Sequence, residues 1–216
     1  MFSSLIRAWL QAYLATCISV CVVITNFEPT TTNYISTGTL ACFILATPLI
    51  SLLILRLNKH RLSEEDFKAS FGTLYQDIEE LKKPQALSFT TLFCVRRIVF
   101  GLTVSFMKTS VYYQLGLTAV ASMVLLGWNV RVMPFQSTFL NVVYIVNELF
   151  FFQLVYLSLL MTPFVPEVED RYTFGYLYLG VVAFNIVMNF SALMWLLVKE
   201  IQKYMKKRKY EKAVVA

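Results

Sequence analysis

Long apolar stretches separated by short polar links dominate this chain. Each stretch has close to the 20 or so residues that an α-helix needs to cross about 30 Å of hydrocarbon. The pattern predicts membrane-spanning helices at residues 9–27, 36–55, 91–108, 111–130, 139–161 and 174–198. We therefore expect an all-α, polytopic membrane helical bundle of six transmembrane helices, built as a single transmembrane domain over residues 1–198.

Two details of these stretches predict how neighbouring helices pack. Pro48 lies inside the second predicted span. It should kink that helix, and neighbouring residues should satisfy the carbonyl that it leaves without a donor. The link between the third and fourth spans is so short that these two helices must form a tight antiparallel hairpin.

The one sizeable polar segment, residues 56–85, shows the pattern of an amphipathic helix. Ser63 is followed by three acidic residues, as at a capped helix N-terminus. Apolar residues then recur at steps of three and four, at Phe67, Phe71, Leu74, Ile78 and Leu81. The pattern predicts one cytosolic helix, or two short ones broken near Gly72. Its apolar face could lie on the membrane surface, pack under the bundle or bind a partner.

Composition and charge support a membrane protein and set its orientation. The chain is 57% hydrophobic and 15% charged, against about a quarter charged in soluble proteins. Its formal charge is +6, but the basic residues lie between and after apolar stretches, so we expect no nucleic-acid partner. With both termini cytosolic, 17 of the 19 Lys and Arg residues fall inside, all except Lys108 and Arg171. The termini are therefore expected on the cytosolic side, or on the matrix side of a mitochondrial membrane.

A basic tail, residues 199–216, follows the last predicted span. At its centre are four consecutive basic residues, Lys206, Lys207, Arg208 and Lys209. This run is a topology signal and is expected to anchor the chain at lipid headgroups; a specific anionic-lipid site is the sharper alternative. Membrane lipids are thus one expected partner.

Opposite charges occur inside two of the predicted spans. Glu148, beside Asn147, lies nine residues into the fifth span, and Arg96 and Arg97 enter the third span from the same side. A lone carboxylate at that depth should be paired, protonated or in a water-filled cavity. Depth permits an ion pair between Glu148 and either arginine, and we expect Arg97 to be the partner. The pair would serve either to fix helix packing or as part of an ion or proton path.

Polar residues also form stripes along several predicted spans. They are Asn141 and Tyr144, in line with Glu148; Gln114, Thr118 and Ser122 on the fourth span; and Asn185 and Asn189 on the sixth. Such residues commonly form hydrogen bonds between helices, at about 0.6 kcal/mol each. We therefore interpret the stripes as helix-packing contacts in preference to the lining of a permeation path.

The chain lacks the motifs of the main membrane enzymes and channels. It has no phosphate-binding glycine loop, zinc-protease motif or nucleophile elbow, and its cysteines lie in or beside apolar stretches. We expect no catalytic site, cofactor or metal site. The link before the last span is too short for a re-entrant pore helix. The sequence thus favours a non-enzymatic scaffold or accessory subunit, in a homo- or hetero-oligomer; an ion channel or transporter module around Glu148 is the alternative.

Several short segments together resemble a family of ciliate multi-span proteins. They are residues 5–14 (LIRAWLQAYL), 71–75 (FGTLY), 92–100 (LFCVRRIVF), 130–135 (VRVMPF), 147–148 (NE) and 170–175 (DRYTFG). In that family, a loosely channel-like helical membrane module usually ends a large cysteine-rich surface protein, and this sequence has no cysteine-rich part. The resemblance marks Arg96, Arg97, Asn147 and Glu148 as positions of interest.

Overall fold

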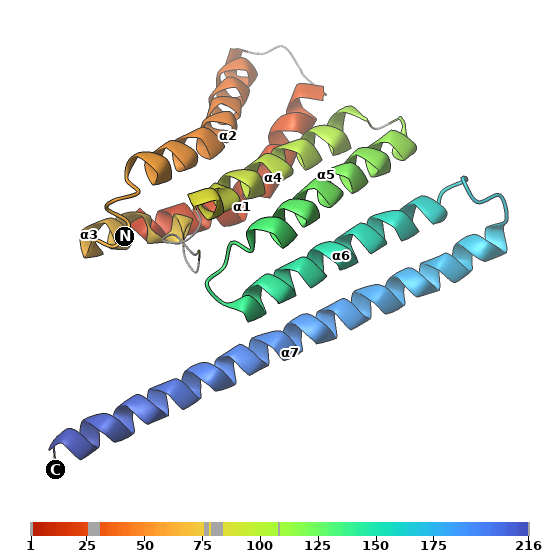
Figure 1. Ribbon diagram of the computed structural model, residues 1–216. Coiled ribbons are helices and arrows are strands. Elements are labelled where there is room, and N and C mark those ends of the chain that lie inside the picture. Colours follow the sequence, from red (N-terminus) through yellow and green to blue (C-terminus); the bar gives the residue numbers. More distant parts are fainter. Residues whose placement is uncertain (1, 26–30, 76–77, 79–83, 108, 216) are drawn as a thin grey trace. The chain divides into compact units, whose positions relative to one another are not determined.

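The computed structural model describes residues 2–25, 31–75, 78, 84–107 and 109–215, and these residues are almost entirely helical (Figure 1). The helices are α1 (Phe2–Thr25), α2 (Thr31–Leu57), α3 (Glu65–Phe71), α4 (Phe89–Phe106), α5 (Val111–Val132), α6 (Thr138–Leu160) and α7 (Val168–Val215), with short 3₁₀ helices at Gly72–Leu74 and Pro84–Ser88. Six described helices are long and apolar enough to cross a membrane. The prediction of an all-α polytopic bundle is confirmed.

Each predicted span coincides with one of these six helices, although the helices extend beyond the predicted limits at several ends. The predicted ends of the first and third spans, Phe27 and Lys108, lie outside the described residues. The chain divides into two compact units, Met1–Glu148 and Leu149–Ala216, so α6 passes from the first unit into the second. Figure 1 shows α4 and α5 side by side and antiparallel, as the short link between them requires.

The core of the first unit lies where α4 packs against α1 and α2. Its buried residues are Tyr13, Cys17, Val20, Ile44 and Cys94. Helices α1 and α4 approach each other closely at Gly101 and Cys17, because a Cβ on Gly101 would lie 3.4 Å from the backbone carbonyl carbon of Cys17. A small residue at this point lets the two helices pack closely, as is common between membrane helices.

Pro48 is buried inside α2, and Figure 1 shows that helix bending along its length. Proline has no N–H, so the carbonyl of Ile44, four residues earlier, has no helical donor. The hydroxyl of Tyr13 on α1 donates to that carbonyl at 2.6 Å. The bond satisfies the freed carbonyl, as predicted, and ties α1 to the kink of α2.

The segment after α2 packs against the helix ends. The helix is broken at Gly72, since the seven residues of α3 are followed there by a 3₁₀ turn. Its N-cap is Glu64, without a side-chain capping bond, so the prediction of a cap at Ser63 is wrong; Glu64 instead accepts a bond from Arg61 Nε at 2.9 Å. The segment's apolar residues form a buried cluster with residues from the ends of α2 and α5 and from the second 3₁₀ helix. Its members are Leu55, Leu62, Phe67, Leu74, Tyr75, Ile78, Ala86, Leu87 and Val132. The predicted Leu81 position lies outside the described residues.

Three distant parts of the sequence meet at this end of the first unit. The hydroxyls of Ser3 and Thr73 form a hydrogen bond, and Thr73 Oγ1 also donates to the Ser3 carbonyl at 3.1 Å. Gln136 Nε2, in the turn between α5 and α6, donates to the carbonyl of Ile78 at 3.2 Å. The start of α1, the segment after α2 and the α5–α6 turn therefore share one end.

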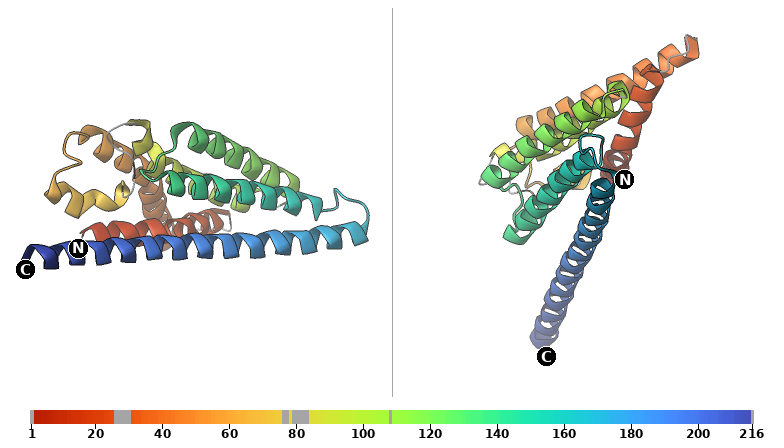
Figure 2. Two further views of the ribbon diagram at one scale, coloured as in Figure 1. Left: turned by 60° about the horizontal axis from the view of Figure 1, so that its bottom comes forward. Right: turned by 90° about the vertical axis from the view of Figure 1, so that its right-hand side faces the viewer.

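The second unit contains the last part of α6 and the whole of α7. The Phe150 and Phe184 rings lie with centroids 5.7 Å apart and hold these two helices together. The 48 residues of α7 form one helix of about 72 Å, an uninterrupted rod in Figures 1 and 2. We expected the basic segment from residue 199 to be a separate tail. The structure continues the helix through Val215, because this stretch is rich in Lys, a good helix former, and contains neither Gly nor Pro.

Candidate functional site: an ion pair among membrane-spanning helices

The only ion pair between two described membrane-spanning helices joins α4 to α6. Arg96 Nη1 donates to Glu148 Oε1. The Glu148 side chain is 6% exposed and that of Arg96 is 23% exposed, so the carboxylate is the more enclosed partner. Counted from the helix starts at Phe89 and Thr138, the two residues lie about 10 and 15 Å along their helices. A carboxylate this deep requires such a partner.

Arg97, the partner that we expected for Glu148, is bound elsewhere. Its Nη1 donates to the backbone carbonyl of Leu10 on α1, and its guanidinium carbon lies 3.9 Å from the centroid of the Phe93 ring. Neighbouring residues on a helix point about 100° apart, so Arg96 and Arg97 face different helices. The prediction of an Arg97–Glu148 pair is therefore wrong: Arg96 faces α6, while Arg97 clamps α4 to α1.

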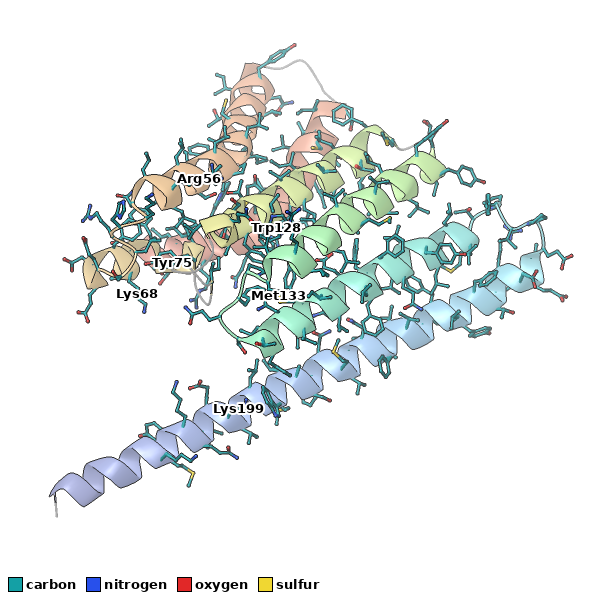
Figure 3. The ribbon with its side chains drawn as sticks, viewed as in Figure 1. Arg56, Lys68, Tyr75, Trp128, Met133 and Lys199 are labelled. Carbon is teal, nitrogen blue, oxygen red and sulfur yellow. The ribbon has the colours of Figure 1, made fainter. Side chains whose placement is uncertain are left out.

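Four aromatic rings lie between the ion pair and the end of the first unit at which α4 begins. The Phe89 ring packs against Trp128, Phe135 and Tyr144, with centroid separations of 6.4, 5.0 and 5.2 Å. Trp128 is labelled in Figure 3, on α5. Phe89 precedes Arg96 by two helical turns, and Tyr144 precedes Glu148 by one. We call these four residues the aromatic cluster; it links α4, α5 and α6 on that side of the pair.

Two polar atoms near this depth have no hydrogen-bond partner among the described residues. They are Glu148 Oε2 and the hydroxyl of Ser122, whose side chain is almost fully buried. Phe89 and Trp128 stack across the antiparallel α4–α5 hairpin. Arg96 is seven residues beyond Phe89 and Ser122 six residues before Trp128, about 10 and 9 Å along the two helices. Ser122 therefore lies at the level of the ion pair.

The other predicted residues of α6 have separate roles. Asn141 is buried and closes the α5–α6 turn: its Oδ1 accepts from the Phe135 N–H at 2.9 Å, and its Nδ2 donates to the Phe135 carbonyl at 2.8 Å. Tyr144 belongs to the aromatic cluster, and Asn147 is half-buried. The turn also holds Met133, labelled in Figure 3, in the left-handed region at φ 47°. Asn141 thus shapes a turn and does not bridge two helices.

Within the remaining polar stripes, Thr118 and Asn189 form hydrogen bonds along their own helices. The Thr118 hydroxyl donates to the Gln114 carbonyl at 2.8 Å, and Asn189 Nδ2 lies 2.9 Å from the Asn185 carbonyl oxygen. These two bonds lie within single helices, because a hydroxyl or amide in a helix finds a carbonyl one turn earlier at no cost in helix separation. The helix-packing role of the stripes stays a prediction.

The predicted headgroup residues lie along the end of α7. Lys206 is exposed, whereas the side chains of Lys207, Arg208 and Lys209 lie outside the described part of the structure. Three cysteines, Cys17, Cys21 and Cys94, are buried, and Cys42 is exposed. Within the described ranges, no group of three or more His, Cys, Asp or Glu side chains could hold a metal ion.

Two residues that matter here carried no signal in the sequence. Tyr13 lies in an ordinary apolar stretch, and only its position beside Ile44 reveals its role. Phe89 lay outside the predicted spans, yet it is at the centre of the aromatic cluster. The position of Pro48 identifies the Ile44 carbonyl as the group that needs a donor. Which side chain donates depends on how α1 packs against α2.

Together, fold and site define a polytopic α-helical membrane protein with a charge pair enclosed among its helices. Comparisons with protein-family models, curated proteins and solved structures found no match to this chain. The resemblance to the ciliate membrane module therefore stays a prediction, and the functional argument rests on the residues themselves.

Proposed function

We propose that this chain is a non-enzymatic, multi-pass scaffold or accessory subunit of a larger membrane assembly. The observation that carries this proposal is the length of α7. About 20 residues cross the hydrocarbon, and α7 has 48. Beyond the apolar stretch it presents exposed apolar and aromatic side chains, among them Ile201, Tyr204 and Met205. A helix that continues far beyond the hydrocarbon offers a partner subunit a surface outside the membrane.

The polar contacts within the first unit support a structural role. Tyr13 binds the carbonyl of Ile44, Arg97 binds that of Leu10, and Arg96 binds Glu148. Each contact joins two different helices, so the polar side chains that are costly in a membrane are used to hold the bundle together. This use leaves the extension of α7 as the surface for assembly.

Purification in mild detergent tests the proposal. We expect the full chain to be isolated as a stoichiometric complex or oligomer, and a chain truncated after Lys199 to be isolated as a folded monomer. The matched control is a chain truncated after Ala213, which keeps nearly all of the extension and should assemble normally. A full-length chain that is a monodisperse monomer with a transport activity of its own would overturn the scaffold proposal.

An ion- or proton-conducting module is the second candidate, favoured by one observation. Glu148 Oε2 and the Ser122 hydroxyl are buried without a hydrogen-bond partner among the described residues. A carboxylate with a spare oxygen inside the membrane is the kind of group that proton and ion paths use. Flux measurements in liposomes distinguish the two candidates. If Glu148 lines a path, Glu148→Gln leaves the folded yield intact and changes the flux. If Glu148 is purely structural, the variant has a lower folded yield and neither the parent nor the variant conducts.

We also propose that both termini lie on the cytosolic side, or the matrix side in a mitochondrial membrane. Support comes from the shared end of the first unit, where exposed Arg7, Arg56, Lys59 and Arg131 flank the segments that meet there. Basic residues are retained on that side during insertion. Glycosylation acceptor sites test this in cells. A site inserted in the link after residue 162 should be glycosylated, and one added at either terminus should not.

A further inference from the structure

The end of α7 carries a marker of the membrane boundary. Lys199 Nζ lies 3.7 Å from the centroid of the Trp195 ring, and Figure 3 labels Lys199 on this helix. Tryptophan is enriched where hydrocarbon meets headgroups, and lysine extends its ammonium group toward that interface. The apolar stretch of α7 also ends at Val198. Trp195 and Lys199 therefore place the interface at this turn of the helix.

Two further lysines continue from Lys199 along one face. Lys203 and Lys206 follow at steps of four and three residues, which keeps all three on the same side of the helix. All three side chains are exposed, that of Lys203 by 80%. Among the side chains that the structure describes here, the acidic group beside them is Glu200, 3.9 Å from Lys203 Nζ and itself 75% exposed. A water-exposed pair of this kind leaves the ammonium group available.

Depth matches this face to the phosphate layer of the membrane. From Lys199 to Lys206 the helix rises about 10 Å, and the headgroup region of one leaflet is about 5–8 Å thick. The flexible lysine stem covers the remaining distance. On the other side of the helix, Ile201 and Met205 are exposed and apolar. The positive charge near the boundary is thus concentrated on one face, at the depth of lipid phosphates.

We propose that Lys199, Lys203 and Lys206 form a binding face for the headgroup phosphates of anionic phospholipids. This places the site one to two turns closer to the membrane than the run from Lys206 to Lys209, where successive residues point about 100° apart around the helix. The face binds the lipid as three point charges, with Lys199 held in position by the Trp195 ring. This inference is independent of the proposed scaffold function.

Native mass spectrometry of the full chain in neutral detergent tests the face, with phosphatidylserine as the probe and phosphatidylcholine as the reference lipid. The variant Lys199→Gln/Lys203→Gln/Lys206→Gln should bind phosphatidylserine on the order of 100-fold more weakly than the parent. The matched control, Arg208→Gln/Lys209→Gln/Lys212→Gln, removes the same charge farther from the boundary and should change affinity by less than about threefold.

Several outcomes would overturn the proposal. The affinity for phosphatidylserine could fall equally in both triple variants or not fall in the first, or the parent could bind the two lipids equally well. Displacement of the lipid by millimolar inorganic phosphate would indicate a free-phosphate site. Unchanged thermal unfolding of both variants in neutral detergent confirms that they are folded. If the first triple variant does not fold, Lys203→Glu replaces it, with at least about tenfold weaker binding expected and unchanged binding contradicting the proposal.

Discussion

The hydroxyl of Tyr13 donates to the carbonyl of Ile44, which is the carbonyl that Pro48 leaves without a donor in α2. The proline bends one helix, and a side chain from a neighbouring helix satisfies the exposed backbone group. A lone carbonyl in the hydrocarbon layer is costly, so the bend and the contact between α1 and α2 depend on each other. This relationship is typical of the first unit, in which polar groups join pairs of helices.

Tyr13→Phe should lower the stability of the folded bundle by about 1 kcal/mol, because the Ile44 carbonyl then has no donor. In a Pro48→Ala background, residue 48 regains its N–H and can donate to the Ile44 carbonyl. The Tyr13→Phe change should then lower the stability of the folded bundle much less. Thermal unfolding of the four proteins in one detergent measures this coupling. An equal cost of Tyr13→Phe in both backgrounds would show that Tyr13 does not serve the carbonyl freed by the proline.

Gly101→Leu should separate α1 from α4 and strongly reduce folded yield. A Cβ at this position already lies 3.4 Å from the Cys17 backbone, so a larger side chain forces the helices apart. Gly116 on α5 provides the control, since no atom lies within 4 Å of a Cβ built there. Gly116→Leu should leave the yield unchanged, as measured by fluorescence-detected size exclusion. Equal yields for the two variants would mean that α1 and α4 do not meet at Gly101.

The α5–α6 turn should respond in opposite directions to two substitutions. Asn141→Ala removes both bonds to the Phe135 backbone and should destabilise the protein by about 1–2 kcal/mol. Met133→Gly relieves the left-handed conformation of a residue that is 41% exposed, and should stabilise it by about 0.5–1 kcal/mol. Melting temperatures of the two variants test this. A lower melting temperature for Met133→Gly would show that the Met133 side chain matters more than its backbone.

The main features of the fold could be predicted because they depend on local rules. Apolar length predicted all six spans, and the short link between α4 and α5 predicted their antiparallel pairing. The break at Gly72 was one of two alternatives, and it reflects the low helix propensity of glycine. The continuous α7 was missed because we ended the helix where hydrophobicity ends, although helix formers continue to Val215.

The site could be predicted in part only, because partner choice depends on packing. Burial cost predicted that Glu148 is paired, protonated or in a water-filled cavity, and depth reduced its possible cationic partners to two neighbouring arginines. Which of them faces α6 depends on the rotation of α4, and a rotation of about 100° exchanges Arg96 and Arg97. The sequence gives no measure of that rotation. Phe93 and Leu10, which bind Arg97 in the structure, likewise carry no distinguishing pattern.

We propose that Arg96 and Glu148 form a structural pair that joins α4 to α6, while Arg97 binds α1. Removing one charge of an enclosed pair leaves the other unpaired, so Arg96→Gln and Glu148→Gln should each destabilise the protein by about 3 kcal/mol. In the double variant no unpaired charge remains, and the loss should be well below the sum of the two.

A double-mutant cycle on thermal stability in detergent is the most direct measurement, performed for Arg96 with Glu148 and, as the matched control, for Arg97 with Glu148. We predict a coupling of about 2 kcal/mol in the first cycle and below about 0.5 kcal/mol in the second. A larger coupling for Arg97 than for Arg96, or no coupling in either cycle, would show that Arg96 and Glu148 do not form a structural pair.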